Sequence, residues 1–192
     1  MPTPDAELML EFQRTGNEDA FAEIVIRYQK RLLNFFYRLV WDEQHAEDLA
    51  QEVFCRVFVH AKSYQAKAKF STYLFRIARN LWIDFHRAQG KMPQTASLSM
   101  PTGSDGSGRL LDNIAAPAEQ AATGGQPDPA GSVQKALEQL SEEQRLVFIM
   151  AKSQGMKYAD IADTLGIPVG TVRSRMHAAV RRLQALLQVP SG

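Results

Sequence analysis

One interruption in the middle of the sequence constrains the fold more than any other feature. Residues 89–132 contain seven glycines and five prolines but few bulky apolar side chains. Such a stretch cannot bury enough apolar surface to fold alone, so we expect a flexible linker. The flanks, residues 1–88 and 133–192, each have the length of a small domain. The sequence therefore predicts two small cores and not one large one.

Apolar side chains on both flanks recur every three or four residues, which is the period of an α-helix. No segment alternates apolar and polar residues as a strand would, so the predicted fold class is all-α, with two small helical domains joined by a linker. Helices are expected within about residues 21–39, 46–61 and 74–85 of the first flank, and 133–140, 145–152, 158–165 and 168–187 of the second.

Local signals mark several helix ends in the second flank. Ser141 and Gln144 have the spacing of a capping box, in which two side chains satisfy the first backbone groups of a helix. Gly155 is expected to end one helix, and Gly166 suits the left-handed residue that follows another. Pro168 is expected in the first turn of the last helix.

The net charge is only +1, yet the charges are segregated along the chain. Residues 1–52 carry eleven acidic and five basic side chains, whereas residues 53–88 carry one acidic and seven basic side chains. Residues 168–188 carry four arginines and no acid. Two basic stretches are typical of proteins that bind nucleic-acid backbones, and an ordinary solvated helix face is the alternative.

Several functional classes are disfavoured. The apolar runs are far shorter than the ~20 residues that cross a bilayer, so no membrane insertion is expected. Residues 1–11 carry acids in place of the basic start of a secretory signal, so we expect a cytoplasmic protein. Cys55 cannot form an internal disulfide and is interpreted as a structural thiol near the apolar stripe. The four histidines lack the spacing of metal ligands or catalytic pairs, so no metal, cofactor or enzyme activity is expected.

Residues 158–175 have the pattern of a helix-turn-helix. Ala162 is small where two crossing helices approach closely, and Gly166 supplies the turn. In this motif the second helix lies in the major groove of DNA, with its N-terminal residues facing base edges. A plain helical hairpin with an arginine-rich face is the alternative. The candidate DNA contacts are Thr171, Arg173, Ser174, Arg175 and His177, and the expected buried stripe is Val172, Met176, Ala179, Val180 and Leu183.

Three motifs together resemble the extracytoplasmic-function (ECF) group of the sigma-70 family of bacterial RNA polymerase sigma factors. They are AEDLAQEVF at 46–54, KFSTYLFRIARN at 69–80 followed by LWIDF, and PVGTVRSR at 168–175. The resemblance implies a region 2 domain at 1–88, a flexible linker at 89–132 and a region 4 domain at 133–192. It further implies a promoter-specificity subunit that binds core RNA polymerase, recognises the minus 35 and minus 10 elements of promoter DNA and helps to melt the DNA.

The resemblance also assigns a docking role to the helix around residues 47–52, which would bind the coiled coil of the largest polymerase subunit. Asp48, Gln51 and Glu52 are three and four residues apart, so they share one helix face. Their oxygen atoms can accept hydrogen bonds from arginines of a partner. A solvated acidic face is the alternative.

The next segment interleaves aromatic and basic side chains, a combination that suits single-stranded nucleic acid. By resemblance it is the surface for the minus 10 element, with residues 63–69 as the loop that captures a flipped base. Core packing is the alternative for Phe70, Phe75 and Trp82. The candidate contacts are Tyr64, Lys67, Lys69, Phe70, Tyr73, Arg76, Arg79 and Asn80, and Trp82 and Arg87 have the same character.

Position along the last helix separates two kinds of DNA contact. Arg173 and Ser174 near its start are expected to read bases of the minus 35 element, because the N-terminal end of such a helix faces base edges. Arg181 and Arg182 lie two turns further on and are expected to neutralise phosphates.

The resemblance and the motifs also bear on further partners and on alternative functions. The resemblance implies an anti-sigma factor that covers a basic face, and a linker that threads the polymerase with residues 109–115 ordered there. The alternative functions are a stand-alone helix-turn-helix regulator with an N-terminal sensing or dimerising domain, and an anti-sigma-binding decoy. The acidic motif followed by an aromatic and basic helix favours the sigma factor, because a sensing domain needs neither.

Overall fold

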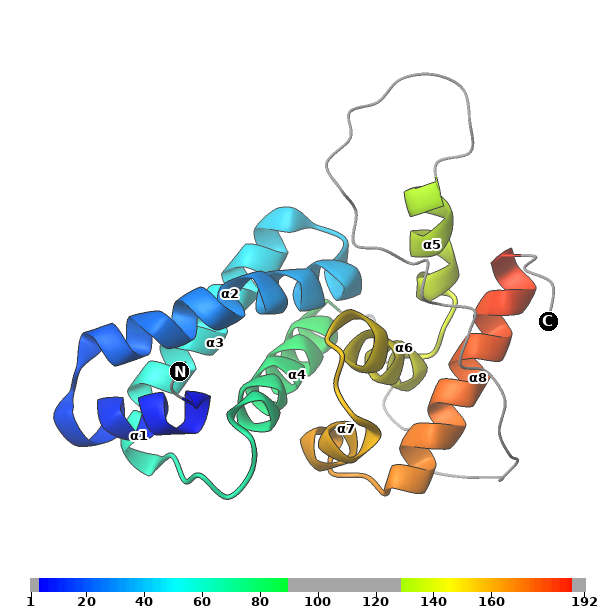
Figure 1. Cartoon of the computed structure of the whole chain (residues 1–192). Helices are drawn as coiled ribbons and strands as arrows, with labels where there is room; N and C mark the ends of the chain where they lie inside the picture. Colours follow the sequence, from blue (N-terminus) through cyan, green and yellow to red (C-terminus); the bar gives the residue numbers. More distant parts are fainter. Residues whose placement is uncertain (1–3, 90–128, 188–192) are drawn as a thin grey trace. The chain divides into compact units, whose positions relative to one another are not determined.

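The computed structural model describes residues 4–89 and 129–187 (Figure 1). These residues form helices and turns without any strand, which confirms the predicted all-α class for the described part of the chain. They divide into two compact units, the first built mainly from α1 to α4 and the second mainly from the helices that follow. Most of the expected linker, with residues 109–115, lies outside the described residues. None of the described helices has the length and apolar character of a membrane span.

The first unit contains the three predicted helices and one that was not predicted. Helix α1 has a short apolar stripe, Leu8, Met9 and Phe12, which is buried against the rest of the unit. Its signal was missed because three apolar residues among acids do not make a long periodic pattern. The elements are α1 (Asp5–Thr15), α2 (Glu18–Val40), α3 (Glu43–Val59), the 3₁₀ turn η1 (Ala61–Ser63) and α4 (Phe70–Ala88).

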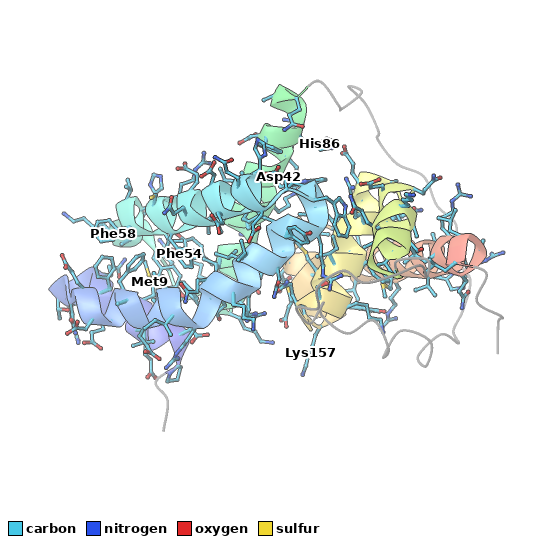
Figure 2. The ribbon with its side chains drawn as sticks, turned by 90° about the horizontal axis from the view of Figure 1, so that it is seen from above. Met9, Asp42, Phe54, Phe58, His86 and Lys157 are labelled. Atoms are coloured by element: carbon cyan, nitrogen blue, oxygen red, sulfur yellow. The ribbon has the colours of Figure 1, made fainter. Side chains whose placement is uncertain are left out.

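The core of this unit is rich in aromatic rings. Phe35 and Phe75 stack edge to face with centroids 5.3 Å apart, and both are fully buried with Phe36. Figure 2 shows Met9 and Phe54 between the helices of this unit. Aromatic pairs of this kind add about 0.5–1.5 kcal/mol to the free energy gained by burying their surfaces. The inner faces of the helices are therefore fixed, and their outer faces are left to other roles.

Each short connection between these helices contains a left-handed residue. Gly16, with a φ of +69°, ends α1, and its N–H donates to the Phe12 carbonyl at 2.8 Å. Asn17 then caps α2 by accepting a hydrogen bond from the Asp19 N–H. Trp41, with a φ of +55°, ends α2 in the same conformation. Tight turns of this kind make consecutive helices pack as neighbours.

The second unit follows the predicted order of helices. Ser141 and Gln144 form the expected capping box, and Gly155 and Gly166 have the expected positive φ values, +63° and +68°. Pro168 lies just before its helix, where its carbonyl accepts hydrogen bonds from the first turn. The elements are α5 (Pro129–Glu138), α6 (Glu142–Phe148), the π-helical turn η2 (Ile149–Ser153), α7 (Tyr158–Leu165) and α8 (Val169–Leu187).

The helix that the Ser141 capping box predicts begins at Glu142, as that signal implies. It then changes to a π-turn in which the Gln154 N–H donates to the Ile149 carbonyl at 3.2 Å. This wider turn keeps Ile149 and Met150 fully buried. The expected stripe of α8, which comprises Val172, Met176, Ala179, Val180 and Leu183, is buried as predicted.

Two glycines of this unit provide a matched pair for a stability test. Gly166 has a φ of +68°, a conformation that raises the free energy of a residue with a Cβ by about 1 kcal/mol or more. Gly170 instead lies in α8, with open space at its Cβ position. We expect Gly166→Ala to lower the free energy of unfolding by about 1 kcal/mol and Gly170→Ala to raise it by roughly 0.5 kcal/mol. Denaturant unfolding of the full chain, followed by circular dichroism, measures both values. Shifts of the same sign would contradict this account of the turn.

Candidate functional site

The outer face of α3 carries the predicted docking residues. Asp48, Gln51 and Glu52 are exposed, whereas Leu49 and Val53 of the same helix are buried. Glu52 accepts a hydrogen bond from the Arg56 side chain at 2.8 Å, and an exposed pair with this spacing contributes only a few tenths of a kcal/mol. The structure thus brings the three polar side chains onto one solvent face, where the fold itself does not need them.

The start of α3 is set by Asp42, which lies at the turn from α2 (Figure 2). Its carboxylate accepts hydrogen bonds from the backbone N–H of His45 at 2.7 Å and contacts the His45 ring at 2.8 Å. These contacts, the backbone one first, hold the pKa of Asp42 below its ordinary value. The cap therefore fixes where the helix begins and which of its residues face solvent.

Cys55 does not lie where the sequence analysis placed it. The thiol is exposed, so the interpretation as a structural thiol on the apolar stripe is wrong. Residue 55 comes three and four residues after Glu52 and Gln51, and side chains with that spacing share a helix face. Its neighbour Phe54 turns toward the other helices instead (Figure 2). An exposed thiol on the same face as Gln51 and Glu52 provides a chemical reporter for that surface.

The structure separates the aromatic from the basic residues of the expected minus 10 surface. Tyr64 and Phe70 are 4% and 2% exposed, and Tyr73, which is half-buried, contacts both rings. Burial raises the pKa of the Tyr64 hydroxyl. Phe75 and Trp82 are buried as well, in agreement with the core-packing alternative. The buried rings lie beneath this surface and support it. For Tyr64 or Phe70 to contact a base, its ring would have to become exposed to solvent.

The polar members of that surface are exposed or half-exposed. Lys67 and Lys69 project from the loop before α4, and Arg76 and Asn80 from α4 itself. Residues 69, 73, 76 and 80 are separated by four, three and four positions, so they share one face of the helix. Arg79 is partly buried, which lowers its pKa, and it donates a hydrogen bond to the Asn80 side chain at 3.0 Å.

One residue that touches this loop was missed. Gln13 of α1 donates from its side-chain nitrogen to the carbonyls of Ala61, Lys62 and Tyr64 at 2.9, 3.0 and 3.0 Å. The partners are about 50 residues apart in the chain, and α1 itself was not predicted. No local sequence pattern could have indicated the contact.

The predicted DNA contacts of α8 have different surroundings. Arg173, Ser174, Arg181 and Arg182 are exposed, and Thr171 and His177 are half-buried. Arg175 instead forms an ion pair with Glu143 of α6 at 2.7 Å, and its side chain is only 24% exposed. Arg175 therefore fastens α8 to α6. The outward-facing start of α8 is formed by Arg173 and Ser174.

Comparison with known proteins identifies the family of this chain. Residues 24–92 match the model of sigma-70 region 2, and residues 130–183 match that of sigma-70 region 4. Over 182 residues the chain is 31% identical to the ECF RNA polymerase sigma factor SigW of Bacillus subtilis (strain 168), covering 91% of this chain and 92% of that protein. The chain belongs to the ECF sigma factors.

Solved structures share the fold of this sigma factor. The structure of CnrH in complex with the cytosolic domain of CnrY covers 97% of this chain and 99% of its own, with a TM-score of 0.70 at 21% identity. The sigma factor RpoE in complex with the anti-sigma factor NepR, from Bartonella quintana, covers 89% and 98%, with a TM-score of 0.65 at 27% identity. Proteins of this family are promoter-specificity factors and in general not enzymes, and the stand-alone regulator is not favoured.

Proposed function

We propose that this ECF sigma factor works through three separate surfaces: a polymerase-docking face on α3, a minus 10 surface on the 63–69 loop and α4, and a minus 35 surface on α8. The observation that carries the proposal is the segregation of charge on exposed helix faces whose opposite sides are buried. We assign residues 1–88 to region 2, 89–132 to the linker and 133–192 to region 4. Polymerase would supply all catalysis, in the cytoplasm.

The docking proposal rests on the exposed acceptors of α3. Asp48, Gln51 and Glu52 present oxygen atoms on one face, and arginines of a partner bind such groups with charge-assisted hydrogen bonds. Complementary charge also speeds the encounter of the two proteins. Cys55 shares this face, so bound polymerase would cover its thiol.

Reversing the charge of the docking face should abolish holoenzyme formation. We expect Asp48→Lys with Glu52→Lys to prevent co-purification with core polymerase in the absence of DNA and to leave the helical circular-dichroism signal unchanged. The matched control is Glu7→Lys with Glu18→Lys, which makes the same change of charge at exposed acids outside the face. In the unaltered protein, core polymerase should slow alkylation of Cys55. Co-purification of the reversed variant at the control level would refute the docking role.

The DNA-binding proposal divides the basic residues by position. Lys67, Lys69 and Arg76 would neutralise phosphates of the unpaired strand, and the half-buried Tyr73 would offer an edge for base contact. On α8, Arg173 and Ser174 would meet base edges, because they lie at the outward start of the helix. Arg181 and Arg182 would contact phosphates.

Two arginine substitutions separate base reading from phosphate binding. Arg173→Ala should change the preferred minus 35 sequence, since an arginine on a guanine edge contributes roughly 1–3 kcal/mol of discrimination. Arg182→Ala should weaken all promoters alike and reduce the slope of affinity against salt by about one. Binding of holoenzyme to a panel of minus 35 variants at several salt concentrations measures both effects. A uniform loss in both variants would remove the base-reading role of Arg173.

We also propose that an anti-sigma factor covers one or both basic faces. Both faces are exposed in the described residues, and the similar RpoE structure was solved with an anti-sigma factor bound. Affinity purification of the tagged chain from unstressed cells should recover a stoichiometric partner that inhibits transcription and is displaced by added core polymerase. Recovery of a free, transcriptionally active chain from those cells would contradict the proposal.

A further inference from the structure

Helix α1 precedes the region 2 match, which begins at residue 24, yet it contacts the segment that leads into the minus 10 loop. Figure 1 shows α1 beside η1, where α3 ends and the loop begins. The contact is made by Gln13, whose side-chain nitrogen donates to the carbonyls of Ala61, Lys62 and Tyr64 at 2.9–3.0 Å. An amide nitrogen carries two hydrogens, so one of them is shared between two of the three oxygens.

We propose that Gln13 is a positioning residue for the minus 10 loop: its amide holds the backbone from which Lys67 and Lys69 are presented to the unpaired DNA strand. This inference rests on the proposed minus 10 role of the loop. Gln13 itself need not touch DNA.

Of the three carbonyls, that of Ala61 also accepts a backbone N–H within the turn, whereas those of Lys62 and Tyr64 lie at the end of the helical segment. The last carbonyls of a helix have no partner within it and are satisfied by water, side chains or a further turn. Here the 3₁₀ turn closes through the Ser63 and Tyr64 N–H groups, which donate to His60 and Ala61 at 3.0 and 3.1 Å. The side-chain nitrogen of Gln13 then donates to three carbonyls of this turn. The path of the chain at residue 64 is thereby fixed relative to α1.

A second contact fixes the same point from the other side. The Tyr64 ring packs on Tyr73 with centroids 5.0 Å apart, and on Phe70 at 6.0 Å. The loop from 65 to 69 therefore runs between two anchored ends, residue 64 and the start of α4 at Phe70. Shortening the free part of a loop reduces the conformational entropy lost when it binds.

The helix that carries Gln13 is itself held firmly. Asp5, at the start of α1, forms an ion pair with Arg27 at 2.8 Å and accepts a hydrogen bond from the Tyr28 hydroxyl. Burial and then the bond to Asp5 raise the pKa of Tyr28, so the hydroxyl stays protonated and donates. At the other end, Phe12 packs against Phe21 and Phe58 with centroids 4.9 and 5.2 Å apart.

Three substitutions of Gln13 separate hydrogen bonding from simple packing. Gln13→Met keeps the length of the side chain without a donor, and Gln13→Glu places carboxylate oxygens against three carbonyls. Gln13→Lys offers three donors for the three oxygens. We expect the Met and Glu variants to bind a single-stranded minus 10 oligonucleotide, as holoenzyme, roughly tenfold more weakly, since the loop loses the contacts that fix its start and must be ordered on binding. Both should discriminate less between bases, and Lys should restore the discrimination.

The controls test whether the effect is confined to the loop. Core binding by all Gln13 variants should equal that of the unaltered chain, and Gln139→Met, the same change at an exposed glutamine of the second unit, should alter nothing. Hydrogen exchange of the amides at 62–69 should accelerate in the Met and Glu variants alone. Base discrimination is the deciding measurement, because the added charge of lysine can raise overall DNA affinity.

The outcomes are distinguishable. If the unaltered holoenzyme binds the minus 10 strand with base preference and the Met and Glu variants do the same, the positioning role is overturned and the proposed function stands. Loss of core binding together with oligonucleotide binding, or failure of Lys to restore discrimination, would assign Gln13 to general stability and also overturn the inference. If the unaltered holoenzyme shows no preference, the proposed minus 10 role fails first.

Discussion

Burial of the apolar stripes of the helices orients every surface of functional interest in this protein. An α-helix can hide only one face in a small core, so the opposite face is forced outward. In α3 the burial of Leu49 and Val53 turns Asp48, Gln51 and Glu52 to solvent. In α8 the stripe that includes Val172 and Met176 does the same for Arg173 and Ser174. The proposed binding surfaces are thus the outer faces of helices whose inner faces pack in the core.

Aromatic packing has a related role in the region 2 unit. Tyr64 and Phe70 were candidate DNA contacts, with core packing as the alternative for Phe70. Both rings are buried, and both contact Tyr73 next to the loop. The cations Lys67 and Lys69 remain outside, on a loop whose start is tied down by Gln13. In the proposed minus 10 role, single-strand binding would depend on how firmly this short basic loop is held, because a mobile loop loses more entropy on binding.

Tertiary contacts give different roles to residues that are neighbours in one helix. Arg173 and Arg175 lie two positions apart in the same basic motif, but a helix places such residues on different faces. Arg175 therefore meets Glu143 of α6, whereas Arg173 faces outward. Cys55 and Phe54 diverge for the same reason, one to solvent and the other toward the neighbouring helices.

The sequence by itself determined the all-α class, the order of seven of the eight α-helices in the described residues, the capping box at Ser141 and the left-handed glycines at 155 and 166. These features depend on periodicity and on backbone preferences within a few residues. The three family motifs also identified the sigma factor. Only the tertiary structure showed α1, the Gln13 contact about 50 residues away and the pairing of Arg175 with Glu143. Such contacts depend on which helices pack together, and a local sequence pattern does not indicate which distant residue will be the partner.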